Sequence, residues 1–136
     1  MHLVPIPTTH ADLWAWHKHW MPFLPKIAQR SGESIDELFD LIEQFQVQIA
    51  LVWDGEKAHA LVGLRVVRRG NDLVGDIVWL TGTARKEWQH LLPDLERYLK
   101  EHCRCSVIRP ICRPGWSRLI KPQGYRTTHY MMEKTL

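Results

Sequence analysis

Apolar residues in the first quarter of the chain recur at roughly the three- and four-residue spacing of an amphipathic helix; they are Leu13, Trp16, Trp20 and Phe23. The stretch 3–6 comes first and is predicted to be a short strand. Thr8 or Thr9 can cap a helix that begins near Ala11, and Asp12 in its first turn favours the helix dipole. Two prolines farther along must interrupt or restart this helix.

A second helix has a stronger start signal. Ser34 and Glu37 form a capping box, in which the two side chains satisfy free amides of the first helical turn. The apolar face behind this box predicts a helix that ends near Gln46. That face consists of Ile35, Leu38, Phe39, Ile42 and Phe45.

The middle of the chain changes to the pattern of β-strands. Predicted strands cover 47–53, 58–69 and 73–80. An Asp-Gly hairpin turn joins the first two strands, and a Gly-Asn-Asp turn joins the second and third. These three strands should form an antiparallel meander.

The last third alternates helices and strands. A long helix is predicted over 84–102, a buried strand over 105–111, a short helix over 114–120 and a final strand over 126–134. The whole order is strand, two helices, three antiparallel strands, long helix, strand, short helix, strand. It predicts an α+β fold with a central sheet, in a single domain that spans 1–136.

Composition and charge limit the classes of function. With 45% hydrophobic and 24% charged residues the chain is an ordinary globular protein, and its net charge of +3 permits an anionic partner without requiring one. No apolar run reaches the roughly 18–20 residues that cross a bilayer. The first seven residues lack the regions of a signal peptide. We therefore expect a cytoplasmic protein with no membrane partner.

No metal site is expected from the cysteines and histidines. Cys103, Cys105 and Cys112 match no strong zinc spacing, so core packing is the preferred interpretation. His17 and His19 lie two apart on a predicted helix, so their side chains point in different directions and one metal cannot readily use both.

Basic residues crowd the C-terminal third, with Trp116 and Tyr125 among them. A basic and aromatic surface of this kind can bind nucleic acid. Strand alternation places Arg109 and Arg113 differently, however, so ordinary solvated charge is the simpler interpretation.

The order of elements, taken with the pair Gly124-Tyr125, resembles the GNAT acetyltransferase superfamily. In that fold the fourth strand meets a long helix at the loop that binds the pyrophosphate of acetyl-CoA. The chain from Trp116 to the Gly-Tyr pair is similar to the family's short helix and glycine–aromatic ending. The resemblance implies a GNAT-like fold, with a mostly antiparallel mixed sheet flanked by helices. It also implies a gap between the fourth and fifth strands that admits the pantetheine arm.

The family's cofactor loop is altered in this chain. GNAT enzymes carry Arg/Gln-x-x-Gly-x-Gly/Ala, whose glycines let backbone amides approach the phosphates. If Leu91-Leu92 is matched to the family's apolar helix pair, the two glycine positions fall at Lys86 and Trp88. A tryptophan there blocks close backbone approach. A bulky Trp79 or Trp88 in the gap would also exclude the pantetheine arm.

The family's usual catalytic residues are replaced as well. The tyrosine that often protonates the departing thiolate falls at Ile120, which cannot transfer a proton, and a common asparagine falls at Arg113. Asp76 enters the fourth strand, where GNAT proteins sometimes place a base. A turn residue at the start of a strand is the simpler account of Asp76.

A narrower resemblance leads to our main hypothesis. Gly82–Trp88, followed by Leu91-Leu92, is similar to small GNAT-like internal virion proteins of podoviruses. It implies a phage-encoded, non-catalytic protein of the host cytoplasm or the virion. Such a protein would act in virion assembly or as a virion component, through contacts with other phage or host proteins. Exposed tryptophans and the segment 113–126 would form the contact surface, and no cofactor is expected.

The alternative hypothesis is a divergent acetyl-CoA-dependent N-acyltransferase. Thr83, Ala84, Arg85 and Lys86 would then hold the pyrophosphate through backbone amides and two cations, and a water-linked Asp76 would deprotonate the acceptor amine. A basic accessory protein that binds nucleic acid is the third hypothesis.

Overall fold

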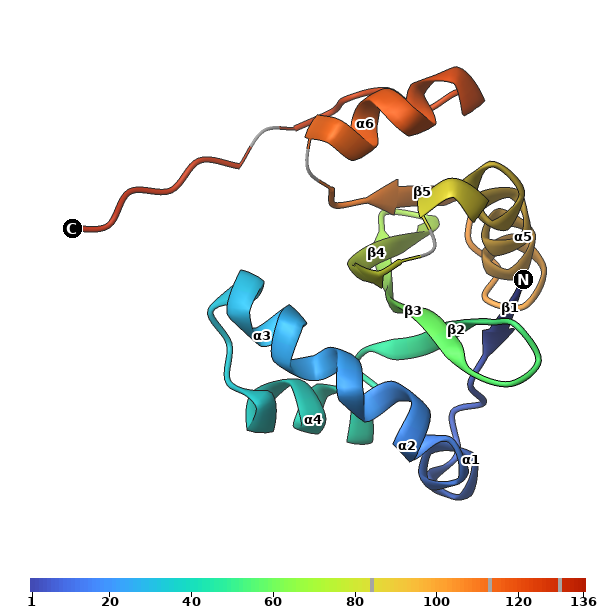
Figure 1. The fold of residues 1–136 in the computed structure, drawn as a ribbon. Coiled ribbons are helices and arrows are strands. Elements are labelled where there is room, and N and C mark those ends of the chain that lie inside the picture. The colour runs from blue at the N-terminus through green and yellow to red at the C-terminus, as the bar shows by residue number, and fades with distance from the viewer. Residues whose placement is uncertain (84, 113, 130) are drawn as a thin grey trace.

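One five-stranded sheet organises the chain in the computed structural model, which describes residues 1–83, 85–112, 114–129 and 131–136 (Figure 1). The strands lie in the order β1 (His2–Pro5), β2 (Gln48–Trp53), β3 (Ala58–Arg69), β4 (Asp72–Gly82) and β5 (Val107–Pro110). Strands β1 to β4 pair antiparallel, and β5 pairs parallel to β4. This mixed, mostly antiparallel sheet with flanking helices confirms the predicted α+β class.

Short N-terminal helices cover one face of the sheet. They are α1 (His10–Ala15), α2 (His17–Trp20), the 3₁₀ turn η1 (Met21–Phe23), α3 (Leu24–Ser31) and α4 (Ile35–Glu43). Their buried side chains form one core with Ile49, Leu51, Leu61 and Trp79 of the sheet. Because the four sheet residues lie on β2, β3 and β4, these helices are held over the centre of the sheet.

Side-chain caps set where two of these helices begin. The Thr9 hydroxyl accepts a hydrogen bond from the Asp12 amide at 3.1 Å, so the predicted cap of the first helix is present. The Ser34 hydroxyl accepts from the Glu37 amide at 3.1 Å and donates to the Glu37 carboxylate at 3.2 Å. The capping box is therefore confirmed.

Two C-terminal helices cover the opposite face. The longer helix α5 (Trp88–Glu101) packs its predicted apolar stripe on β2, β3 and β4, and α6 (Pro114–Ile120) adds Trp116 and Ile120 to the same core. Helix α5 begins later than predicted, because η2 (Arg85–Glu87) is a 3₁₀ turn. None of the helices in the described part of the chain is long and apolar enough to span a membrane.

The predicted closing strand over 126–134 is wrong for the described residues of that range. Residues 126–129 and 131–134 form no strand and are exposed, and the segment runs away from the body of the molecule (Figure 1). A strand exists only where a neighbour completes its backbone hydrogen bonds. Here β5 pairs with β4 alone and remains an edge strand, so the described residues of 126–134 have no partner strand.

The C-terminal half of β4 is irregular. The register between β3 and β4 shifts so that Gly63 faces Trp79 and Leu64 faces Ile77, which leaves Val78 as a bulge. Strand β5 pairs with β4 only from Val74 to Ile77. Within the described chain, residues 78–82 of β4 therefore have a neighbouring strand on the β3 side alone.

Candidate functional site

A gap opens where the pairing of β4 and β5 ends. The last hydrogen bond between the two segments joins the Ile111 amide to the Ile77 carbonyl oxygen at 3.1 Å. Beyond it lies a cavity of about 30 Å³, which has room for about one or two water molecules. Its lining is mainly apolar and comes from β4, from the end of β5, and from α5 and α6. The residues include Leu80, Trp88, Leu92, Pro110, Cys112, Trp116 and Ile120.

Two tryptophans make this gap narrow. Trp88 is 3% exposed and meets Trp116 edge to face, with ring centroids 6.1 Å apart. Trp79, the other residue that the sequence suggested as a filler, lies on the opposite face of the sheet, against the N-terminal helices. Of the two suggested residues, therefore, Trp88 lines the gap and Trp79 does not.

Strand β4 presents an unpaired backbone edge to the gap. The Thr83 amide donates to the His59 carbonyl oxygen of β3 at 2.9 Å. Because alternate residues of a strand direct their backbone groups to opposite sides, the N–H and C=O groups of Leu80 and Gly82 point away from β3. An extended ligand that carries amide groups can pair with such an edge.

The loop after β4 departs from a phosphate-binding loop. The Thr83 amide is already bonded to His59, and its hydroxyl lies 3.4 Å from the same oxygen. Lys86 is exposed in η2, Arg85 belongs to the same turn, and Ala84 lies outside the described residues. The cofactor role of Thr83, Ala84, Arg85 and Lys86 stays a prediction.

Gly82 is needed at the end of β4 because of a close backbone approach. Its φ is +133°, in a region that favours glycine, and a Cβ atom there would clash with the His59 carbonyl oxygen and with Ala60. A glycine is therefore required where β3 and β4 approach each other at this end of the sheet.

Asp76, the candidate base, is paired with Arg109. The Asp76 side chain is buried, with 6% of the residue exposed, and its two oxygens lie 2.6 and 2.9 Å from Nε and Nη2 of Arg109. The two residues are direct register partners across β4 and β5. Hydrogen bonding to Asp76 raises the pKa of Arg109. Both oxygens of the Asp76 carboxylate are therefore engaged by one guanidinium group. Its role as a base stays a prediction.

The position that matches the family's tyrosine lines the gap but has no acidic proton. Ile120 is buried there. Of the side chains that line the gap, the exposed Cys112 carries the titratable proton. Cys103 is half-buried and Cys105 is buried, and burial raises the pKa of all three thiols. The sequence did not single out Cys112 for this place, because one cysteine beyond a strand end forms no motif.

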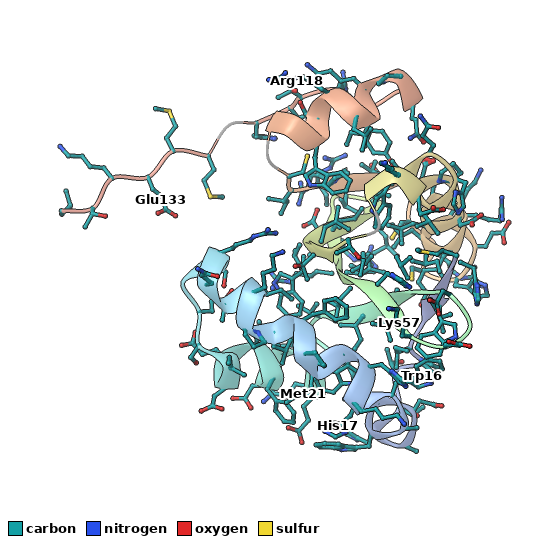
Figure 2. The ribbon with its side chains drawn as sticks, in the orientation of Figure 1. Trp16, His17, Met21, Lys57, Arg118 and Glu133 are labelled. Atoms are coloured by element: carbon teal, nitrogen blue, oxygen red, sulfur yellow. The ribbon has the colours of Figure 1, made fainter. Side chains whose placement is uncertain are left out.

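The histidines of the first helices contact aromatic rings. His17 lies 5.3 Å from the Trp14 ring and His19 lies 4.8 Å from the Trp53 ring, so the two side chains do point in different directions. Trp16 and His17 are labelled near α1 and α2 in Figure 2. Across the described ranges, no three His, Cys, Asp or Glu side chains are grouped closely enough to hold a metal ion.

The predicted basic residues do not share one environment. Arg109 is paired with Asp76, whereas Arg118 is exposed on the outer side of α6 (Figure 2). Arg113 lies outside the described residues. A nucleic-acid surface in this region stays a prediction.

Comparison with known proteins supports the fold. No protein-family model and no curated protein matches the chain. Solved structures match over its full length. They include a ribosomal-protein-alanine N-acetyltransferase from Brucella melitensis biovar Abortus 2308, with a TM-score of 0.71 at 10% identity, covering 100% of this chain and 99% of that one.

Two further structures give the same result. A probable acetyltransferase matches with a TM-score of 0.68 at 15% identity, covering 100% of this chain and 97% of the other. An aminoglycoside antibiotic 6'-N-acetyltransferase from Acinetobacter haemolyticus matches with a TM-score of 0.65 at 14% identity, covering 100% and 98%. The chain therefore has the GNAT acetyltransferase fold. At these identities the likeness shows the fold and leaves activity open.

Proposed function

We propose that this chain binds acyl-CoA in the gap between β4 and β5 and is a divergent N-acyltransferase. The observation that carries the proposal is the unpaired edge of β4 beyond Ile77, bordered by an apolar lining. The pantetheine arm of CoA is a flexible chain with amide groups, and such a chain can bond to the edge of a strand. The N-acetyltransferases among the similar structures support the same class of activity.

The apolar lining of the gap is chemically compatible with the pantetheine arm, but the gap is small. A cavity of about 30 Å³ is too small for a pantetheine arm. Trp88 and Trp116 meet edge to face across it. Binding therefore requires these two rings to move apart. The proposal implies that acyl-CoA binding changes the environment of both indoles.

Acyl transfer to an amine requires two proton movements. The acceptor nitrogen loses a proton as it attacks the thioester carbonyl, and the departing thiolate gains one. A bound CoA thioester supplies the activated acyl group. Cys112 lines the gap and is the candidate proton donor to the thiolate, although burial raises the pKa of its thiol. A water-linked Asp76, held by Arg109, is the candidate base.

Calorimetric titration with acetyl-CoA and with CoA tests the proposal. We expect saturable micromolar binding to the wild-type chain. Trp88→Leu should bind more tightly, because the smaller side chain widens the gap, while Trp79→Leu makes the same change on the opposite face and should leave affinity unchanged. If neither the wild type nor a folded Trp88→Leu variant binds millimolar ligand, the proposal fails.

Thiol labelling gives an independent readout of the same site. Cys112 is exposed, Cys103 is half-buried and Cys105 is buried. Iodoacetamide should therefore label Cys112 fastest, and acetyl-CoA, which has no free thiol, should slow that labelling by covering the gap. The slower labelling of the other two cysteines should stay the same, which makes them internal controls. Equal labelling of Cys112 with and without saturating acetyl-CoA would count against binding in the gap.

The second candidate is a non-catalytic protein that acts through protein contacts, in virion assembly or as a virion component of a phage. Two observations favour loss of catalysis: Trp88 narrows the gap, and Ile120 stands where the family's proton donor falls. The local resemblance of Gly82–Trp88 supports the virion role. Binding by Trp88→Leu but not by the wild type would favour this candidate, because the fold would then retain a blocked site.

A further inference from the structure

A second and larger pocket lies on the opposite face of β4 from the gap. Its volume is about 330 Å³, and it lies between the η1–α3 region, the start of β3 and the end of β4. Leu80 lines the gap and its neighbour Thr81 lines this pocket. Successive side chains of a strand point to opposite faces, so the two sites are separated by the strand itself.

The pocket brings together positive groups that are distant in the sequence. Lys26 comes from the first turn of α3, and Lys57, labelled in Figure 2, comes from the turn between β2 and β3. Neither lysine has an ion-pair partner within the described part of the chain. The lining contains no acidic residue. Such a lining favours a negatively charged ligand.

The nearby carboxylate of Asp54 is already occupied. It lies 2.6 Å from Nε2 of His59, another lining residue, and its second oxygen accepts from the amides of Glu56 and Lys57 at 2.8 Å. The contact with His59 is the largest cause that lowers the pKa of Asp54. The Asp54 carboxylate is therefore bonded to its own hairpin and to His59, and neither lysine is paired with it.

A buried hydroxyl at this pocket lacks a partner. Thr81 is 5% exposed, and its Oγ1 forms no hydrogen bond with any described residue. A buried polar atom without a partner lowers the stability of the fold. Thr81 lines the pocket that also contains the two lysines, so a ligand oxygen that reaches this hydroxyl would satisfy it.

We infer that this pocket binds a small molecule that carries a phosphate or carboxylate group. The oxygens of that group would accept hydrogen bonds from the Thr81 hydroxyl and from the ammonium groups of Lys26 and Lys57. The volume lies at the lower end of the range for small-molecule sites, about 300–1,000 Å³. The ligand is therefore a small organic anion. This inference goes beyond the proposed function and does not depend on acyl-CoA in the gap.

The test is a ¹H–¹⁵N NMR titration of the full chain with inorganic phosphate, with acetate and with sodium chloride at matched ionic strength. We expect saturable shifts of the amides of Lys57, Thr81, Gly82 and Thr83 with phosphate or acetate, and none with chloride. The anion that binds with the higher affinity identifies whether the ligand carries a phosphate or a carboxylate group. If neither anion gives saturable shifts at these amides, the inference is wrong.

Single variants separate a built site from general charge attraction. Lys26→Met, Lys57→Met and Thr81→Val should each weaken anion binding by about fivefold or more, as expected for the loss of one hydrogen bond to a charged group. Lys100→Met removes the same charge from the far helix α5 and should leave the affinity unchanged. Equal affinities in all four variants would overturn the inference. The titration contains no CoA, so its failure is distinct from failure of acetyl-CoA binding.

Discussion

Thr81 keeps a buried hydroxyl at a place where valine would fill the same space without a polar atom. Its side chain is enclosed on the face of β4 that packs against the N-terminal helices, and its oxygen has no partner among the described residues. An unpaired buried hydroxyl lowers stability. Sites that lower stability without an evident structural gain are often functional sites. This single residue therefore connects the energetics of the strand to the anion pocket.

Replacing Thr81 with valine should stabilise the protein in the absence of ligand. Removing the unpaired hydroxyl at nearly constant volume should raise the free energy of unfolding by about 1 kcal/mol. Urea denaturation of both proteins measures the difference. Thr83→Val is the control, because its hydroxyl is close to the His59 carbonyl oxygen and exposed. A less stable Thr81→Val protein would mean that the hydroxyl has a partner.

Gly82→Ala should destabilise the fold more than an alanine at another left-handed glycine. Gly55 has a φ of +103° and open space around its Cβ position, whereas a Cβ on Gly82 would meet the His59 carbonyl oxygen. We expect a loss of about 1 kcal/mol for Gly55→Ala and about 2–4 kcal/mol for Gly82→Ala. Thermal or urea unfolding compares them. Equal losses would show that β3 and β4 separate easily at this end.

At the scale of elements, the pair of β4 and β5 is short and depends on one ion pair. Four residue pairs join the strands, from Val74 to Ile77 on β4, and Asp76 with Arg109 is one of them. The parallel partner β5 follows a long helix, so its register with β4 cannot come from a tight turn. The bidentate ion pair supplies a specific contact that holds this register.

Arg109→Met should destabilise the protein, because it leaves the buried Asp76 carboxylate without its partner. A loss of about 2–3 kcal/mol is expected, somewhat below the value for a fully buried pair because the Arg109 side chain is 36% exposed. Arg97→Met breaks an exposed pair with Asp94 and should cost less than about 0.5 kcal/mol. Chemical denaturation of both variants gives the comparison, and similar small losses would contradict a structural role for Asp76.

The elements also show which sequence patterns are reliable. The two helix caps, at Thr9 and at Ser34 with Glu37, depend on atoms within four residues of one another, so they could be predicted from the sequence. The β3 strand, Ala58–Arg69, has its predicted bounds. The prediction of a closing strand over 126–134 was wrong for the described residues. A β-rich pattern indicates which residues could pair, but it does not indicate whether a partner strand lies within reach.

At the scale of the whole molecule, two cores share one sheet. The N-terminal helices pack on one face, and α5 with α6 packs on the other (Figure 1). The gap lies on the α5 and α6 side, and the anion pocket lies on the side of the N-terminal helices. Both sites adjoin the end of β4, where β5 no longer covers the sheet. After α6, Tyr125 packs against the core on the α5 side, whereas residues 126–129 and 131–136 join neither core.

Deleting residues 131–136 should therefore leave stability nearly unchanged. Met131, Met132 and Leu136 are almost fully exposed, and Glu133 lies on the extended end of the chain in Figure 2. The free energy of unfolding should change by less than about 0.5 kcal/mol. Thermal unfolding and gel filtration check this expectation. A large fall in stability, or a change in molecular size, would mean that the segment pairs with something outside the single chain.

The candidate site was only partly predictable. The family resemblance placed Trp88 in the loop after β4 and Ile120 at the position of the family's tyrosine, and both residues line the gap. Asp76 was named as a base, but its partner Arg109 lies on another strand, and no local pattern joins the two. Thr81, with Lys26 and Lys57, was missed for the same reason. These three residues come from three separate elements and belong to no motif.

Local chemistry and periodicity were enough to determine the order of the five strands β1 to β5, the helix caps and the α+β class. Hydrogen bonds and apolar spacing within a few residues encode these features. Tertiary structure alone decided that β5 stops pairing at Ile77, that Asp76 is paired with Arg109, and that the described residues after α6 have no strand partner. It also decided that Thr81 is buried beside two lysines. Each of these outcomes depends on which distant residues become neighbours, and that is set by how the two cores pack on one sheet.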